Sequence, residues 1–148
     1  MIKATSGDDT LGYAGDLSVQ DAWKKLAAEP TALLVDVRSD AEWTFVGMPD
    51  LAPLGKQPVF IQWQVFPGMV PNQNFVAEVK AKAPGMDAPL LFLCRSGGRS
   101  KSAAMALTAQ GYRQCYNIAG GFEGDLDADK HRGHVGGWKA AGLPWLQR

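Results

Sequence analysis

The sequence predicts an α/β domain with a mainly parallel central sheet and helices on both faces. The chain has 148 residues, a length that suits one domain around a single core. Short, almost unbroken apolar runs, typical of strands buried on both faces, alternate with segments of helical periodicity. No internal repeat interrupts this alternation. Because strands that alternate with helices usually form a parallel sheet, we expect one such domain over residues 1–148.

The first helix is predicted over residues 18–30. Ser18 is a suitable N-cap residue, Asp21 follows three residues later, and Pro30 ends the pattern. The apolar side chains of this segment lie along one helical face: Val19, Ala22, Trp23, Leu26 and Ala27. Residues 1–16 are expected to form a loosely ordered N-terminal extension.

The remaining elements follow in alternation. Apolar runs predict strands over 32–37, 58–63 and 89–94, and a weaker strand over 115–121. Helical patterns are predicted over 74–84 and 100–111, and a terminal helix or turn over 136–145. Gly111 is well placed to end the helix that precedes it.

Composition and charge exclude several classes of protein. Fifteen basic and fifteen acidic residues balance, so no basic surface for nucleic acid or an anionic membrane is expected. No apolar stretch approaches the roughly 20 residues of a membrane span, and the first ten residues do not resemble a secretory signal. The two cysteines do not form a disulfide framework. We therefore expect a cytoplasmic protein.

Cys94 is the candidate nucleophile. It ends the predicted strand 89–94, and ligand sites in parallel sheets lie beyond the carboxyl ends of the strands. The loop that follows leads directly into a helix, so backbone N–H groups and the helix N-terminus should converge on an anion there. Arg95 and Arg99 add positive charge. We expect a thiolate at neutral pH, with a buried structural cysteine as the alternative.

The length of this loop separates two kinds of chemistry. Tyrosine-type phosphatases place five residues between cysteine and arginine, whereas four residues separate Cys94 from Arg99. The segment CRSGGRS, residues 94–100, resembles the six-residue active-site loop of rhodanese-type sulfurtransferases. Two further segments resemble hallmarks of that family in the same order: DVRSDAEW at 36–43, and AGGF at 119–122 with Trp138 and GLP at 142–144.

The resemblance implies a thiosulfate sulfurtransferase-like enzyme with a single rhodanese-like domain. Cys94 would accept a sulfane sulfur, become a persulfide and pass the sulfur to a thiophilic acceptor. The expected partners are a small anionic sulfur donor and a thiol or cyanide acceptor, with a protein acceptor as a further possibility. No metal or organic cofactor is implied. The residues implied to cradle the sulfur and the donor anion are Arg95, Ser96, Gly97, Gly98, Arg99 and Ser100.

Asp36 and Arg38 match positions that organise the surroundings of the site in this family. An ion pair that closes the end of the strand 32–37 is at least as good an interpretation as direct contact with substrate. Glu42 is interpreted as structural as well.

The sequence departs from the family pattern at three places. Many members continue into a Gly-His-Ile-Pro-Gly run, where this chain has Gly47, Met48, Pro49 and Asp50. A longer connection covers residues 63–74, and an insertion covers residues 123–137. We expect these two segments to form a rim near the active site that selects the sulfur donor or acceptor, with Trp63 as the tryptophan best placed to touch substrate.

Other features of the sequence favour simpler interpretations. Asp125, Asp127 and Asp129 have the spacing that opens a calcium loop, but Lys130 and Gly136 occupy positions that need Gly and Glu. His131 and His134 have no cysteine or third histidine nearby in sequence, so surface histidines are expected. Cys115 starts one predicted strand while Cys94 ends another, which favours a structural thiol over a resolving cysteine.

Three functions remain open on the sequence alone. A sulfurtransferase ranks first. A protein-to-protein sulfur carrier or rhodanese-like binding module ranks second, and phosphatase or arsenate reductase chemistry at the same cysteine ranks third.

Overall fold

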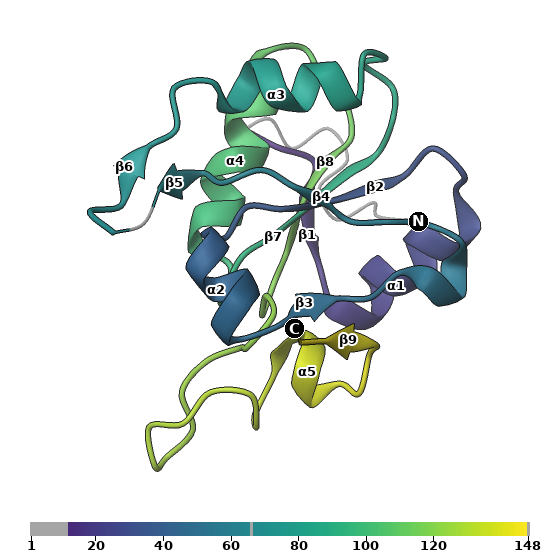
Figure 1. The fold of residues 1–148 in the computed structure, drawn as a ribbon. Coiled ribbons are helices and arrows are strands. Elements are labelled where there is room, and N and C mark those ends of the chain that lie inside the picture. The colour runs from purple at the N-terminus through teal and green to yellow at the C-terminus, as the bar shows by residue number, and fades with distance from the viewer. Residues whose placement is uncertain (1–11, 66, 148) are drawn as a thin grey trace.

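The computed structural model describes residues 12–65 and 67–147. Helices and strands alternate along most of the chain, as Figure 1 shows. The strands are β1 (Gly15–Leu17), β2 (Leu33–Asp36), β3 (Met48–Pro49), β4 (Val59–Phe60), β5 (Gln64–Val65), β6 (Val70–Pro71), β7 (Leu90–Leu93), β8 (Cys115–Ile118) and β9 (Trp145–Leu146). The helices are α1 (Val19–Ala28), α2 (Asp40–Phe45), α3 (Phe75–Lys82), α4 (Gly98–Ala109) and α5 (Gly137–Ala140), with a short 3₁₀ helix at Ala52–Leu54.

Five strands form the central sheet in the order β1-β8-β7-β2-β4, and every neighbouring pair in it is parallel. The predicted parallel α/β architecture is therefore confirmed. All residues of β7 and β8 are buried, which explains why these strands appear in the sequence as continuous apolar runs rather than alternating ones. Because all five strands run the same way, the segments that follow β2 and β7 leave from the same edge of the sheet.

Helices cover both faces of this sheet, α3 and α4 on one and α1 with α5 on the other (Figure 1). Alternate residues of β7 serve the two cores: Leu90 and Phe92 pack with α3 and α4, whereas Leu91 and Leu93 pack with α1. Helix α1 begins after the predicted cap, since the Ser18 side chain accepts a hydrogen bond from the backbone N–H of Asp21 at 3.0 Å. No helix in the described part of the chain is long and apolar enough to cross a membrane.

The N-terminal boundary differs from the expectation. Residues 1–11 lie outside the described residues, but β1 pairs with β8, and Tyr13 is buried in the core with an exposed fraction of 4%. Residues 13–16, expected to belong to a loose extension, are thus part of the packed fold. A three-residue strand at a sheet edge carries too short a pattern to be recognised before its partner is known.

Two other segments were also predicted incompletely. The strand expected over 58–63 is reduced to β4. Beyond it, the backbone N–H groups of Ile61 and Trp63 still donate to the backbone carbonyls of Asp36 and Val37. Helix α2 was not expected at all. It has no buried residue, so it lacks the apolar periodicity by which helices are usually recognised.

Candidate functional site

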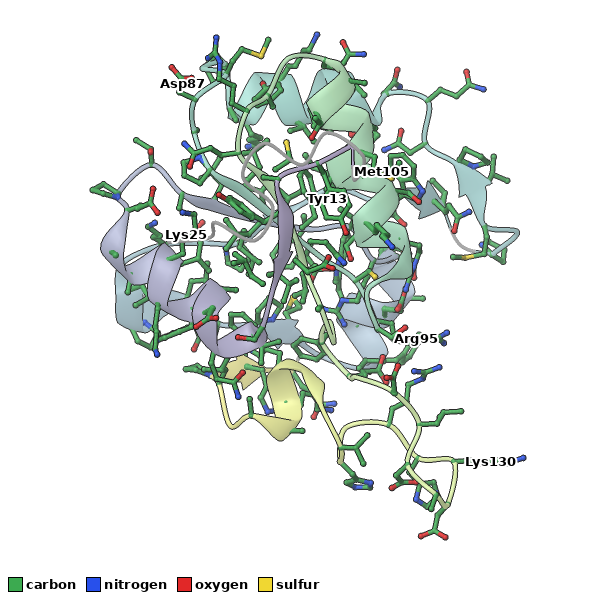
Figure 2. The ribbon with its side chains drawn as sticks, turned by 180° about the vertical axis from the view of Figure 1, so that it is seen from behind. Tyr13, Lys25, Asp87, Arg95, Met105 and Lys130 are labelled. Atoms are coloured by element: carbon green, nitrogen blue, oxygen red, sulfur yellow. The ribbon has the colours of Figure 1, made fainter. Side chains whose placement is uncertain are left out.

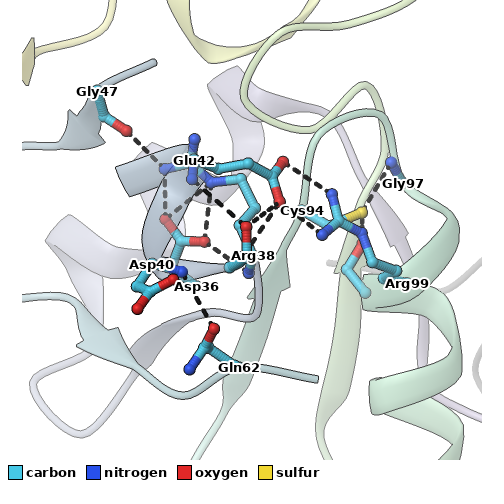
Figure 3. A network of polar contacts seen from close by, with 11 residues as sticks. Asp36, Arg38, Asp40, Glu42, Gly47, Gln62, Cys94, Gly97 and Arg99 are labelled. Carbon is cyan, nitrogen blue, oxygen red and sulfur yellow. Dashed lines mark hydrogen bonds and ion pairs between the residues drawn. The ribbon is translucent and has the colours of Figure 1, made fainter. Parts of the chain in front are cut away.

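Cys94 directly follows β7, at the carboxyl edge of the sheet, and its side chain is buried with an exposed fraction of 1%. The backbone N–H of Gly97 donates to Sγ over 3.1 Å (Figure 3). The Ser100 hydroxyl lies 3.1 Å from the same sulfur. Helix α4 begins at Gly98, so the positive end of a twelve-residue helix faces this loop. The predicted loop from Cys94 to Ser100 therefore directs one backbone N–H, that of Gly97, at the sulfur.

A chain of side-chain hydrogen bonds continues from the sulfur to β1, the outermost strand on one side of the sheet. The Ser100 hydroxyl donates to Asn117 Oδ1 at 2.5 Å, and Asn117 Nδ2 donates to Asp16 Oδ1 at 3.0 Å. The Tyr13 hydroxyl donates to the same Asp16 oxygen at 2.9 Å. Burial and this contact raise the pKa of Tyr13 to about 12, so its hydroxyl remains protonated. Asn117 and Asp16 are site residues that the sequence did not reveal.

Arg99 forms a bidentate ion pair with Glu42 of α2, with Nη1 to Oε1 at 2.7 Å and Nη2 to Oε2 at 2.9 Å (Figure 3). Burial alone would raise the pKa of Glu42, but the hydrogen bonds from Arg99 and Ser39 outweigh it and lower that pKa to about 2. Both groups therefore remain charged at neutral pH. Glu42 thus connects α2 to the cysteine loop, a role that the sequence did not indicate.

The position of Glu42 is fixed by a capping box at the start of α2. The Ser39 hydroxyl accepts from the backbone N–H of Glu42, while Glu42 Oε1 accepts from the backbone N–H of Ser39 at 3.1 Å. The same carboxylate thus caps its own helix and holds Arg99.

Asp36 and Arg38 form a fully buried ion pair beneath α2 (Figure 3). Arg38 Nη2 lies 2.7 Å from Asp36 Oδ2 and also donates to the Gly47 carbonyl at 2.8 Å. The guanidinium stacks over the ring of Phe122 at 4.2 Å. With no exposed surface on either side chain, the pair fixes the segment after β2, as the structural interpretation of the sequence predicted.

The Gly120-Gly121-Phe122 turn lies directly behind the cysteine loop. The backbone N–H of Phe122 donates to the Cys94 carbonyl at 2.8 Å. Gly121 has a φ of +63°, and a Cβ atom at this position would lie 2.5 Å from the Cys94 carbonyl oxygen. Only glycine permits this approach, which accounts for Gly121 in the segment AGGF.

A cleft of about 500 Å³ adjoins the loop and is lined by α2, the β5–β6 hairpin and the two loop arginines. Gln64 and Met69 reach it from the connection 63–74, which was expected to hang over the site; Phe66 lies outside the described residues. Arg95 is exposed and lines the cleft. Among the described residues, none of the insertion 123–137 lines it, although Glu123 and Gly124 donate backbone hydrogen bonds to the Arg95 carbonyl.

Two other residues singled out in the sequence do not line the cleft. The half-buried Trp63 ring packs edge-on against Phe75 with centroids 4.9 Å apart, which gives it a packing role, and its contact with substrate stays a prediction. Cys115 pairs in register with Leu90, four residues before Cys94, which separates the cysteines by about 13 Å along the strand. Burial raises the pKa of the Cys115 thiol to about 11. A disulfide between them would require the backbone to rearrange.

The parallel sheet, the cysteine loop before α4 and the glycine turn behind it define a rhodanese-like domain. A structure of Rv0390 from M. tuberculosis superposes with a TM-score of 0.85 and 48% identity, covering 92% of this chain and 99% of that one. The family described as the STR4 middle domain matches residues 14–148, and this chain belongs to that family.

Two curated relatives place the chain further. An uncharacterized protein of Rickettsia conorii is 42% identical over 124 residues, covering 84% of this chain and 90% of the relative. The thiosulfate sulfurtransferase GlpE of Pseudomonas savastanoi is 33% identical over 95 residues, covering 64% of this chain and 73% of the relative. These similarities support membership of a sulfurtransferase-like family.

Proposed function

We propose that this protein transfers sulfane sulfur through a persulfide on Cys94. The observation that carries the proposal is the buried Sγ at the carboxyl end of β7, with the Gly97 N–H directed at it over 3.1 Å at the start of α4. The similarity to a thiosulfate sulfurtransferase supports the same chemistry.

In the first step the Cys94 thiolate attacks the outer sulfur of thiosulfate. A new S–S bond forms as the donor S–S bond breaks, and sulfite leaves with the bonding electron pair. In the second step an acceptor such as cyanide or a thiolate attacks the outer sulfur, and the Cys94 thiolate is released again. No net oxidation of the protein occurs over the cycle.

The Ser100 hydroxyl is placed to follow the charge on the sulfur. While the hydroxyl donates to Asn117 at 2.5 Å, its oxygen can accept a hydrogen bond from the Cys94 thiol. When the thiol is ionised, rotation of the hydroxyl would direct its hydrogen at Sγ, beside the Gly97 N–H. Such donors stabilise a developing sulfur anion, as donors in an oxyanion hole do for oxygen.

The balance of charge around the loop limits how strongly a small dianion can be held. Glu42 engages both terminal nitrogens of Arg99, so that arginine contributes little net charge. We assign the electrostatic attraction of a donor to Arg95, with the backbone N–H groups of Ser96, Gly97 and Gly98 completing the cradle. Asp36 and Arg38 support this arrangement from below without touching substrate.

A protein acceptor is the second candidate because apolar side chains surround the cleft. Phe45 of α2 is 78% exposed, and the hairpin adds exposed Val65, Met69 and Val70. Exposed apolar surface beside a reactive group is typical of a docking site for another protein. We propose that the β5–β6 hairpin and α2 form the part of the rim that selects the acceptor.

The test is a steady-state assay of transfer from thiosulfate to cyanide and to a small thiol. We expect turnover by the wild-type chain with double-displacement kinetics, and none by Cys94→Ser. Turnover that survives in Cys94→Ser would refute the proposed nucleophile. A wild-type chain that forms the persulfide but turns over with neither small acceptor would instead favour the sulfur-carrier function.

A further inference from the structure

The insertion 123–137 brings together three side chains that can bind a metal. Asp127, His131 and His134 each offer one ligand atom, and these atoms all lie within 4.8 Å of one another. The sequence favours surface histidines, because it has no cysteine or third histidine near them; the structure instead brings the Asp127 carboxylate to the pair. We propose that these three residues form a site for a divalent transition-metal ion, with zinc as the preferred occupant.

The Asp127 carboxylate is held in place by the loop itself. Its Oδ1 atom accepts hydrogen bonds from the backbone N–H groups of Asp129 and His131, each at 2.9 Å. Its Oδ2 atom lies 2.9 Å from His134 Nδ1. One oxygen is thus used to orient the group, and the other faces the histidines. A carboxylate fixed in this way loses little freedom when a cation binds.

The backbone of the loop is closed at its base. The Gly124 and Gly137 backbones approach so closely that a Cβ atom on Gly137 would lie 2.6 Å from the Gly124 nitrogen. Gly133 N–H donates to the Glu123 carbonyl at 2.7 Å, and Arg132 donates to the Gly124 carbonyl at 2.7 Å. Both ends of the segment are therefore tied together, and the turn Asp127 to His131 is closed by a further backbone hydrogen bond at 2.8 Å.

The donor set favours a particular class of cation. Two imidazoles and one carboxylate suit zinc and related transition metals, whereas calcium and magnesium prefer all-oxygen sites. Bonds of about 2.0 Å in a tetrahedral site place ligand atoms roughly 3.3 Å apart, so no present separation has to shrink by more than about 1.5 Å. The His134 side chain is 62% exposed and free to make that adjustment. Three protein ligands leave a fourth position open to water.

The site lies in the part of the insertion that projects from the body of the domain, as the position of Lys130 at its outer end shows (Figure 2). At the other end of the segment, Glu123 and Gly124 donate to the carbonyl of Arg95 in the cysteine loop. A bound ion would therefore order a segment that is anchored behind the active site, without being part of the sulfur chemistry.

The test uses the full chain with Cys94→Ser, so that the reactive thiol cannot bind the metal and the result does not depend on sulfur transfer. After treatment with a chelator, zinc chloride is titrated in competition with a chromophoric zinc indicator. We expect one equivalent to bind, with affinity at least tenfold lower when Asp127→Asn or His131→Ala is added. Asp125→Asn removes a neighbouring exposed carboxylate outside the cluster and should leave the affinity unchanged.

A second readout identifies the ligands directly. The chain has only two histidines, and both belong to the proposed site, so every imidazole signal in an NMR spectrum reports on it. Both sets of signals should shift as one equivalent of zinc is added, while circular dichroism confirms that all variants are folded. The proposal is overturned if no zinc binds in the titration, if Asp127→Asn binds as tightly as Asp125→Asn, or if the imidazole signals do not move.

Discussion

Replacement of Glu42 by glutamine tests the ion pair that joins α2 to the cysteine loop. The pKa of Glu42 falls from 4.5 to about 2 in the folded protein. A shift of this size corresponds to about 3 kcal/mol of stability at neutral pH. The side chains of the pair are only 18% and 19% exposed, so solvent screens the interaction weakly. Because glutamine retains one acceptor for Arg99, we expect Glu42→Gln to cost about 2 to 3 kcal/mol at pH 7.

The dependence on pH follows from the direction of the shift. A lowered folded-state pKa stabilises the protein above pH 4.5, and this stability is lost as the pH falls toward 2. The difference in free energy of unfolding between wild type and Glu42→Gln should therefore shrink by about 2 kcal/mol from pH 7 to pH 3, as measured by urea unfolding at several pH values. Asp40→Asn, a matched change in the same helix with no ion pair in the structure, should cost less than about 0.5 kcal/mol. If the difference in free energy of unfolding between wild type and Glu42→Gln stayed constant from pH 7 to pH 3, the proposed role of the ion pair would be refuted.

Three further predictions concern the loop and its support. Gly121→Ala should destabilise the chain by about 3 kcal/mol or more in thermal or urea unfolding, because the added Cβ collides with the backbone of Cys94 and Arg95. At Gly133 φ is also positive, +86°, but the space is open, so Gly133→Ala should cost only about 1 to 2 kcal/mol. Equal costs for the two variants would contradict the collision. Ser100→Ala should slow persulfide formation about tenfold in a stopped-flow assay, whereas Ser102→Ala on the exposed face of α4 should leave the rate unchanged. Equal rates of persulfide formation in the two variants would argue against a role for the Ser100 hydroxyl. Cys115→Ala should leave the persulfide yield unchanged, since burial raises the pKa of that thiol to about 11 and keeps it protonated; a large loss in a folded variant would indicate a resolving cysteine.

The elements with long apolar patterns could be predicted from the sequence. Helices α1, α3 and α4 and the buried strands β2, β7 and β8 all bury regular sets of side chains, and their order determined the fold class. The position of Cys94 at the end of β7 followed from the same pattern. Elements that bury little were missed, among them α2 and the short hairpin strands β5 and β6. The Ser39 to Glu42 capping box was a usable signal for α2, because its spacing is visible in the sequence.

The long-range contacts of the site could not be predicted in this way. Glu42 and Arg99 are 57 residues apart, and Asp16 and Asn117 are 101 apart, so no local spacing relates them. Only the parallel pairing of β1 with β8 places Asp16 directly beside Asn117. For the same reason Arg99, expected from the sequence to hold an anion, is found engaged by a carboxylate from another element.

The central claim, that Cys94 carries sulfane sulfur, is tested most directly by intact mass spectrometry after incubation with thiosulfate. The wild-type chain should gain the mass of one sulfur atom, the gain should disappear with a reductant, and Cys94→Ser should show none. No gain on the wild-type chain with thiosulfate or a glutathione persulfide, or an equal gain on Cys94→Ser, would contradict the claim.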